Sequence, residues 1–506
     1  MADLKSNPAT PAEMPVAASL AGETANGFFW LVGQTFGTKL FSFATQIALA
    51  RLLEPHDFGL VALAYTAVSF AGIIRWTGLQ QILVQRHERF RRWVNPAFWL
   101  ELAISLAATL LLVIASPIAA AVFRSPSLIG LILVIASAAP LSPWFVIPTA
   151  RLTIDMRFRA MALINVVYSA VVMLLSIFLA WRGFGAYSFV IPLPIAGAVR
   201  AAWLWGLARP QIKLKPQLRR WRFLLDDSIS MLAIGFLNSV MFQAGCLVLG
   251  IMRSKTDVGE FFLALNLSTQ ISQLLSQNLG SVLLPVLAKM QRQADRGTAA
   301  LIGASRLLSF SSTPLCLLLA AAAKPIVEVL YGTKWLPAVP MLQIMAIVAA
   351  VNVPSGPAET ALQAQGRFSK LFRWTAVQAP LFVVLIVIGS WLDGPIGVTF
   401  MWLVFALAAS PITIILALGK QCQKRTILDI YAGPLAAGAL ALAVPTAAAA
   451  LWPNLTTNRI SWLGVATLTM AAVYLLSSLL FCRPELELLL AYVRSTLAAV
   501  GVGRRR

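Results

Sequence analysis

GFFWLVGQTFGTKLFSFATQIALA (27–50), RLLEPHDFG (51–59) and LVALAYTAVSFAGIIRWTGLQQILVQ (60–85) form the stretch that decides the fold. It consists of two long apolar segments joined by a short polar link, and each segment carries one positive charge, Lys39 or Arg75. A cation near the middle of a membrane helix costs about 2.5–3.5 kcal/mol on insertion scales. Two such cations in neighbouring spans therefore indicate a polar cavity that accepts an anionic group, and this hairpin is expected to line a transport path.

The composition is that of a polytopic, all-α integral membrane protein. Hydrophobic residues make up 59% of the chain and charged residues only 12%, with a mean hydropathy of +0.80. The net charge of +21 does not indicate nucleic acid, because the basic residues are scattered between apolar runs, as in proteins oriented by positive cytoplasmic loops. The four cysteines share no close spacing, and His56 and His87 have no partner at ligand spacing, so we expect neither a metal nor a cofactor.

Apolar windows of about 20 residues predict fourteen transmembrane helices. They lie at 27–50, 58–80, 96–123, 128–148, 160–181, 185–207, 228–252, 258–285, 304–323, 338–362, 372–390, 395–419, 431–451 and 461–481. Of the 40 Lys and Arg residues, 29 then fall on cytoplasmic segments and 8 on external loops. This alternation predicts that both termini are cytoplasmic.

The two halves of the chain show a faint repeat with an offset of two hundred residues. Ile47–Gly59 aligns without a gap with Leu247–Gly259, so that both halves carry an Asp-x-Gly pair, which we interpret as turn-forming. Six helices followed by six give a parallel pseudo-repeat around a central cavity, with two extra helices after it. The predicted divisions are a disordered cytoplasmic tail (1–26), an N-lobe (27–208), a basic cytoplasmic linker (209–227), a C-lobe (228–419), two helices (420–482) and a cytoplasmic tail (483–506).

Polar side chains at helical spacing form stripes on three of the predicted spans. The stripes are Thr35, Lys39, Ser42 and Gln46; Asn266, Gln270, Gln273 and Gln277; and Asn352, Ser355, Glu359 and Gln363. Together they favour a wet cavity for a hydroxyl-rich cargo, although each residue could instead bridge packed helices. Lys39 lies 12 and 11 residues from the ends of its span, which makes snorkelling to an interface unfavourable, whereas Arg75 and Arg200 could snorkel.

Prolines interrupt two spans, at Pro192 and Pro194 and at Pro354 and Pro357. Freed backbone carbonyls at membrane depth are tolerated where they face protein or water. We therefore expect the stretch just before Glu359 to be a hinge. Glu359, the one acidic residue singled out among mostly positive charges within the spans, could be a counter-ion or a protonatable coupling group.

Ala48–Gly59 resembles the link between helices one and two in bacterial polysaccharide exporters, the Wzx-type flippases of the multidrug/oligosaccharidyl-lipid/polysaccharide superfamily. Gly78-Leu79 followed by Gln85-Arg86, and Gly332-Thr-Lys-Trp335, resemble further signatures of that family, and the likeness covers about residues 25–375. It implies two six-helix lobes that move an undecaprenyl-diphosphate-linked oligosaccharide to the outer leaflet by alternating access. Relatives often carry an acidic residue just before Gly-Leu, where this chain has Arg75-Trp76-Thr77.

The resulting hypothesis is a flippase of the bacterial inner membrane for exopolysaccharide, O-antigen or capsule export, and not an enzyme. Lys39, Arg75 and Arg200 would hold the diphosphate. The residues expected to contact sugars are Thr35, Ser42, Gln46, Asn266, Gln270, Gln273, Gln277 and Asn352. Membrane lipid, a polymerase and glycosyltransferases of the same pathway are the further partners considered. The alternatives are a lipid II-type precursor flippase, a cation-coupled multidrug exporter and a membrane glycosyltransferase or polymerase.

Overall fold

A computed structural model describes residues 13–72, 79–85, 88, 90–210, 212, 221, 229–270, 273, 294–419, 424–451, 468–477 and 479. All regular structure in these ranges is helical. The first part contains α1 (Glu13–Leu52), α2 (Pro55–Gly72), α3 (Leu79–Gln85), α4 (Phe90–Val122), α5 (Ser127–Ser137), η3 (Ala139–Leu141), α6 (Pro143–Ile154), α7 (Phe158–Trp181), α8 (Tyr187–Val190) and α9 (Pro192–Ala208). The second contains α11 (Ile229–Met252), a helix at 255–270, α13 (Ala294–Ala321), α14 (Ala323–Ile326), η5 (Val327–Tyr331), η6 (Thr333–Trp335), α15 (Ala338–Asn352), η7 (Val353–Ser355), α16 (Gly356–Ala364), α17 (Phe368–Leu418), α18 (Lys424–Leu451) and a helix at Leu468–Ser477.

Within these ranges, eight helices are long and apolar enough to cross a membrane, or nine if the bent pair 127–154 counts as one span. The predicted membrane-protein class is therefore confirmed, and the count of fourteen stays a prediction. α17 contains two predicted spans in one helical run. It leaves helical geometry only at Asp393 and Gly394, where Gly394 adopts φ +54°.

The chain divides into two compact units, residues 1–53 with 67–232 and residues 54–66 with 233–506. Residues 55–66 of α2 belong to the second unit and the rest of α2 to the first, and the predicted lobe boundaries stay predictions. Residues 13–26, which the sequence analysis assigns to a cytoplasmic tail, extend α1 at its N-terminal end. Their sequence is rich in alanine, and Pro15 lies in the first turn, where a helix needs no amide donor.

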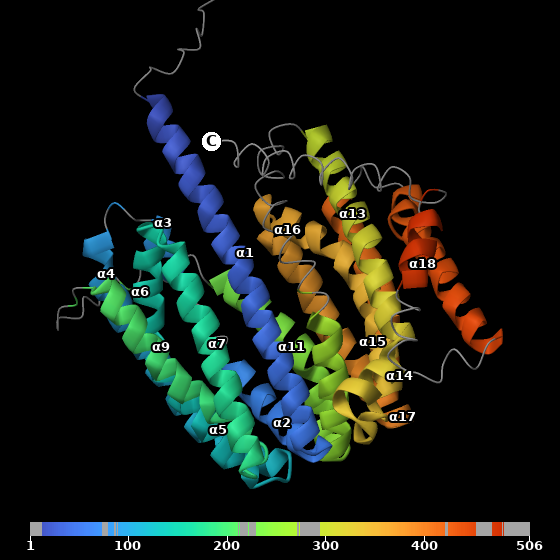
Figure 1. Ribbon diagram of the computed structural model, residues 1–506, viewed down its shortest axis with the longest axis horizontal. Helices are drawn as coiled ribbons and strands as arrows, with labels where there is room; N and C mark the ends of the chain where they lie inside the picture. The colour runs from blue at the N-terminus through green and yellow to red at the C-terminus, as the bar shows by residue number, and fades with distance from the viewer. Residues whose placement is uncertain are drawn as a thin grey trace, which may run out of the picture. The chain divides into compact units, whose positions relative to one another are not determined.

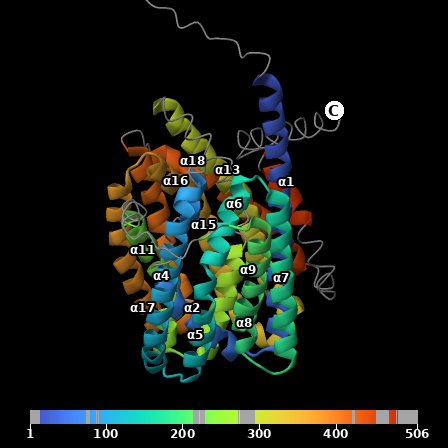
Figure 2. The same ribbon diagram turned by 90° about the vertical axis from the view of Figure 1, so that its left-hand side faces the viewer.

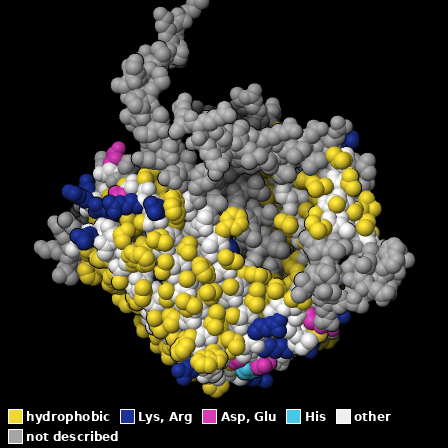
Figure 3. Space-filling model, in the orientation of Figure 1, with side chains coloured by type: hydrophobic (Ala, Val, Ile, Leu, Met, Phe, Trp, Pro, Cys, Tyr) yellow, Lys and Arg dark blue, Asp and Glu magenta, His cyan; other side chains and the backbone are white. Residues whose placement is uncertain are grey.

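In the first unit, α1 packs along α7, and α9 packs against both α6 and α7 (Figures 1 and 2). Hydrophobic side chains cover most of the described surface over α5, α7 and α9, as Figure 3 shows, while Lys and Arg gather toward the helix ends. Leu163, Leu174 and Phe178 of α7 are among these exposed apolar residues. Such a surface is what lipid-facing helices require, which agrees with the predicted spans.

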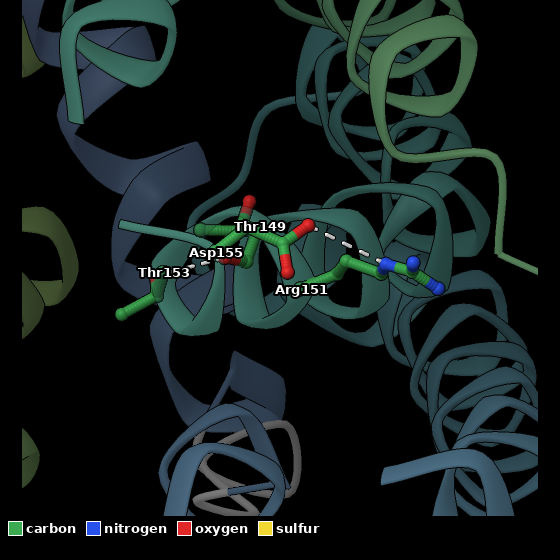
Figure 4. Close-up of polar contacts among 4 residues, drawn as sticks. All are labelled: Thr149, Arg151, Thr153 and Asp155. Atoms are coloured by element: carbon green, nitrogen blue, oxygen red, sulfur yellow. Dashed lines mark hydrogen bonds and ion pairs between the residues drawn. The ribbon is translucent and has the colours of Figure 1, made fainter. Parts of the chain in front are cut away.

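The C-terminal end of α6 carries the basic residue predicted for the cytoplasmic side. Arg151 lies in the last turn, and its Nε is 3.6 Å from Oδ2 of Asp155, while the Thr153 hydroxyl donates to the Thr149 carbonyl (Figure 4). A cation at a helix C-terminus is favourable because the last carbonyls carry partial negative charge. The pair is exposed, so its direct contribution to stability is at most about 1 kcal/mol.

The span 127–154 bends by 42°, and a buried carboxylate lies at the bend. Ser142, at the start of α6, donates its hydroxyl to Oε1 of Glu101 in α4, and both side chains are buried. A carboxylate at a helix N-terminus compensates the unpaired amides and the partial positive charge there. This contact therefore fixes the bend to the neighbouring helix.

We expect Ser142→Ala to lower the free energy of unfolding by about 1–3 kcal/mol, because it leaves the buried Glu101 carboxylate with one donor fewer. Thermal unfolding of the purified protein measures the change. Ser137→Ala is the matched control, since the exposed Ser137 hydroxyl bonds only to the Val134 carbonyl of its own helix. Equal stability of the two variants would contradict the role assigned to Ser142.

In the second unit, α13 lies beside α15 and α18 (Figure 1). The predicted proline break is present, because the 3-10 helix η7 separates α15 from α16 at Pro354. At Pro192 the interruption is a single residue, Ile191, which separates α8 from α9 but keeps helical dihedral angles. Proline removes an amide donor and clashes with the preceding turn, which accounts for both interruptions.

Candidate functional site

The polar stripe of α1 points away from the helix on which α1 packs. Gly37 faces α7, because a Cβ at that position would lie 3.2 Å from the Val166 side chain. At 3.6 residues per turn, the stripe lies about 140–200° around the helix from Gly37. The stripe consists of Thr35, Lys39 and Gln46, which are half-buried, and Ser42, which is exposed. Packing on α7 therefore does not account for the position of Lys39 and of the other side chains in this stripe.

Arg75 lies outside the described residues, so its predicted role stays a proposal. Arg200 of α9 lies within the first unit, against two aromatic rings. Its guanidinium carbon is 5.5 Å from the ring centre of Phe145 in α6 and 5.2 Å from that of Tyr168 in α7. Contacts of this kind contribute about 0.5–2 kcal/mol. Within the described part of the chain, the buried Nε of Arg200 makes no hydrogen bond. The geometry shows that Arg200 braces three helices, and leaves its predicted contact with an anion as a proposal.

The stripe on the helix at 255–270 is only partly described. Asn266 donates its Nδ2 to the Phe262 carbonyl at 2.9 Å, a bond within its own helix. Gln270 is half-buried and Gln273 is exposed, while Gln277 lies outside the described residues. Asn266 thus has a local packing role, and the two glutamines remain candidates for contact with cargo.

The third stripe crosses the break between α15 and α16. Oδ1 of Asn352 accepts a hydrogen bond from the Ser410 hydroxyl of α17 at 2.7 Å, so Asn352 bridges two helices, which was one of the two interpretations left open. Ser355 is buried, and its hydroxyl caps the Asn352 carbonyl at 2.7 Å. Glu359 and Gln363 are exposed on α16.

The sequence interpretation overlooked two buried acidic residues. Glu101 in α4 and Glu260 in the helix at 255–270 have exposed fractions of 2% and 8%, so Glu359 is not the one acidic residue within the spans. The signal was present, because any ionisable residue inside an apolar run marks a polar contact or a functional site. Among the described residues no group of His, Cys, Asp and Glu side chains could hold a metal ion.

The two Asp-x-Gly pairs lie inside helices and do not form turns, so that interpretation is wrong. The Asp57 and Asp257 carboxylates accept the amide hydrogens of Glu54 and Ser254, at 3.4 and 3.2 Å, and thereby cap the starts of the two helices. Neither glycine has a positive φ.

The two glycines instead allow the helices to cross with their backbones in contact. A Cβ at Gly59 would overlap the Lys255 carbonyl oxygen, and one at Gly259 would overlap the Pro55 carbonyl oxygen. The two contacts, Gly59 with Lys255 and Gly259 with Pro55, exchange places when each residue is replaced by its counterpart two hundred positions away. The crossing is therefore pseudo-symmetric, which supports the repeat.

Two stretches that resemble family signatures, Ala48–Gly59 and Gly332–Trp335, meet beside this crossing: Phe58 and Glu54 of the first contact Trp335 and Lys334 of the second. The ring centres of Phe58 and Trp335 are 4.7 Å apart in an edge-to-face contact, and Trp335 is fully buried. Lys334 Nζ lies 3.6 Å from Glu54 Oε1. Gly332 adopts φ +99°, which turns the chain so that Trp335 can enter this contact. The two stretches therefore pack against each other, and their residues have a structural role at this position.

The chain is similar to known proteins of polysaccharide biosynthesis. Residues 48–340 match the family described as polysaccharide biosynthesis protein. The succinoglycan biosynthesis transport protein ExoT of Rhizobium meliloti is 28% identical over 74% of this chain and 76% of its own length. The lipopolysaccharide biosynthesis protein WzxC of Escherichia coli is 24% identical over 76% of this chain and 79% of its own.

Two solved structures share the fold. The lipid II flippase MurJ, in an inward closed conformation, matches with a TM-score of 0.73 and 15% identity, over 91% of this chain and all of its own. An inward-facing multidrug resistance transporter of the MATE family matches with a TM-score of 0.59 and 14% identity, over 78% of this chain and 95% of its own. At these identities the likeness concerns the fold alone.

Proposed function

The chain belongs to the family of polysaccharide biosynthesis proteins, and from that premise we propose that it is a flippase for lipid-linked oligosaccharides. Its cargo is an undecaprenyl-diphosphate-linked repeat unit, which it moves across the bacterial inner membrane by alternating access. The product serves exopolysaccharide, O-antigen or capsule export. The names of ExoT and WzxC, a transport protein and a lipopolysaccharide biosynthesis protein, support this class of cargo.

The observation that carries the proposal is the polar stripe of α1, with a lysine at its centre. Lys39 sits in that stripe together with hydroxyl and amide side chains, and the stripe is turned away from α7. A cation in a low-dielectric setting attracts a phosphate group strongly, and hydrogen bonds to charged groups contribute about 1.5–3 kcal/mol. Lys39 therefore binds the diphosphate, with Arg75 and Arg200 as further candidates for the same group.

Uncharged side chains supply the contacts for the sugar part of the cargo. Ser42, Gln46 and Gln273 are exposed or half-buried on their helices, and amide and hydroxyl groups can both donate to and accept from sugar hydroxyls. The prenyl tail remains in lipid. Both termini lie in the cytoplasm. Glycosyltransferases of the same pathway act before the flipping step, and a polymerase acts after it.

Two other transporter functions share the fold, a precursor flippase like MurJ and a multidrug exporter like the MATE transporter. The sequence relatives favour polysaccharide, because the proteins at 28% and 24% identity are named for succinoglycan and lipopolysaccharide biosynthesis, while the two structural neighbours are only 15% and 14% identical. A catalytic role as glycosyltransferase or polymerase has no support among these relatives.

Deletion of the gene tests the cargo. We expect an undecaprenyl-diphosphate-linked oligosaccharide to accumulate on the inner leaflet and surface polysaccharide to disappear, with both reversed by the intact gene. Lipid extraction with mass spectrometry identifies the accumulated species. Accumulation of the peptidoglycan precursor with cell lysis would instead show the MurJ-like function. Drug sensitivity with normal surface polysaccharide would show the exporter function.

A further inference from the structure

Arg200 carries a positive charge into the interior of the first unit without a counter-ion among the described residues. The six spans predicted between residues 27 and 207 contain one acidic residue, Glu101, and its carboxylate already accepts the Ser142 hydroxyl. In the described part of the chain, Arg200 makes neither an ion pair nor a hydrogen bond. An uncompensated charge at membrane depth is costly, and such residues usually mark an ion or substrate path. A ligand that supplies the missing negative charge would remove this cost.

Two aromatic rings hold the guanidinium group of Arg200 and leave one edge of it open. Its carbon lies 5.5 and 5.2 Å from the ring centres of Phe145 and Tyr168, so the group is held between α6 and α7. Arg200 is half-buried, and of its nitrogens only Nε is fully buried. The two Nη nitrogens are therefore reachable. They form an edge that can bind a carboxylate through two parallel hydrogen bonds.

Uncharged polar groups of α7 lie on the same side of that helix as Tyr168. At 3.6 residues per turn, Asn165, Tyr168 and Ser169 lie about 140–240° around α7 from Leu163, which is exposed on the apolar outer face. All three are half-buried. The inner face of α7 beside Arg200 thus carries an amide and two hydroxyl groups, which can donate to and accept from sugar hydroxyls.

Arg200 lies too far from Lys39 for both to hold one diphosphate. Gly37 of α1 packs on Val166 of α7, and Val166 lies about 200° around α7 from Tyr168, so α1 and Arg200 are on nearly opposite sides of α7. Lys39 in turn lies on the side of α1 that faces away from α7. Both helices therefore stand between the two cations (Figure 1), and each occupies about 8–10 Å in a packed bundle. A diphosphate is shorter than this separation, whereas an oligosaccharide can span it.

We propose that Arg200 anchors a second anion site, which takes an acidic sugar of the cargo, one that carries a carboxylate. This assignment rests on the proposed flippase function and deepens it by naming the class of glycan. A carboxylate fits because Arg200 is a single charge: the spans predicted at 128–148 and 160–181, which supply the two rings, contain no Lys or Arg. One carboxylate compensates one guanidinium, while the amide and hydroxyl groups of α7 bind the hydroxyls of the same sugar.

Purified full-length protein in detergent tests the site without cargo. Its unfolding temperature is followed by tryptophan fluorescence in sodium glucuronate, in sodium acetate with glucose, and in sodium chloride with glucose, at equal sodium and sugar concentrations. We expect glucuronate to raise the unfolding temperature by about 1 °C or more relative to both controls, because a ligand that binds only the folded state stabilises it. Arg200→Gln should abolish this shift, and Arg200→Lys should reduce it, since lysine keeps the charge but lacks the guanidinium edge.

Arg209→Gln is the matched control and should keep the shift, because Arg209 is exposed at the end of the same helix and its Nε bonds to the Gly206 carbonyl. Lys39→Met should keep the shift as well, and its loss there would overturn the separation of the two sites. Equal unfolding temperatures in glucuronate and the two controls would overturn the acidic-sugar site, as would a shift that survives in Arg200→Gln. Each variant is compared with itself across the three solutions, so a change in its basal stability does not affect the result.

The composition of the cargo gives a second test that needs no variant. In the gene deletion, the accumulated undecaprenyl-linked oligosaccharide is expected to contain at least one carboxylated sugar, which mass spectrometry of the released glycan detects. A neutral glycan would overturn the acidic-sugar site and leave the flippase function standing. If no lipid-linked oligosaccharide accumulates, the flippase function itself is contradicted, and the acidic-sugar site falls with it.

Discussion

Lys39→Met is expected to reduce the transfer of lipid-linked oligosaccharide by about tenfold or more while the folded protein stays at normal abundance. Methionine keeps the length and apolar stem of lysine and removes only the charge. If that charge holds the diphosphate, its loss removes about 1.5–3 kcal/mol of binding, and 1.4 kcal/mol corresponds to a factor of ten. Surface polysaccharide and the inner-leaflet pool of undecaprenyl-linked oligosaccharide, measured in the same cells, report the loss.

Lys39→Arg should retain most of the transfer, since a guanidinium also binds phosphate. Leu40→Met, at the neighbouring exposed position of α1, is the control for general effects on this helix. Lys39→Met is also expected to leave α1 in the membrane, because insertion of a helix becomes more favourable when a charge is removed from its middle. Wild-type export by a normally abundant Lys39→Met protein would refute the phosphate site without disturbing the family assignment.

Gly259→Ala is expected to produce, together with Gly59→Ala, the largest loss of stability among single methyl additions to the described glycines of the second unit. The new Cβ would overlap the Pro55 carbonyl oxygen and would lie 2.9 Å from the Gly59 amide nitrogen. Both obstacles are backbone atoms, so no side chain can rotate away, and the two helices must separate. Overpacking of this kind costs about 1–3 kcal/mol or more, which should appear as a lower unfolding temperature and less protein in the membrane.

Gly59→Ala should give a similar loss, because its Cβ would overlap the Lys255 carbonyl oxygen in the pseudo-symmetric contact. Gly206→Ala serves as the control, since a Cβ in that part of α9 meets no atom within 4 Å. It should be neutral or slightly stabilising, because alanine is the better helix former. If Gly259→Ala and Gly206→Ala unfold at the same temperature, the close helix crossing does not contribute to stability as described.

The sequence predicted the helical segments well because membrane helices are specified by local composition. A run of about 20 apolar residues must satisfy its backbone hydrogen bonds internally, so α4, α7 and α11 lie close to the predicted spans. Proline acts equally locally, and the break at Pro354 lies where it was predicted. α1 begins at Glu13, before the predicted span, because a segment can form a helix without being apolar enough to cross a membrane.

Contacts between distant segments of the chain could not be predicted from the local sequence. The Asp57-x-Gly59 pair looks like a turn, because Gly and Asp favour turns locally. The same glycine in a helix is required where another backbone comes close, and only the position of residues 255–259 shows that this is the case here. Likewise Glu101 is a lone acidic residue in the sequence and a partner of Ser142 in the fold.

The sequence by itself thus determined that this is a polytopic helical membrane protein, with Lys39 deep in the first predicted span as part of a stripe of polar residues. These properties depend on local hydrophobicity and on helical spacing, which each segment carries on its own. The tertiary structure decided which interpretation holds for individual polar residues. The direction of the α1 stripe depends on Gly37 packing against α7, the role of Asn352 on Ser410, and the surroundings of Arg200 on Phe145 and Tyr168. Each of these contacts joins residues that are distant in the chain, and no local pattern contains that information.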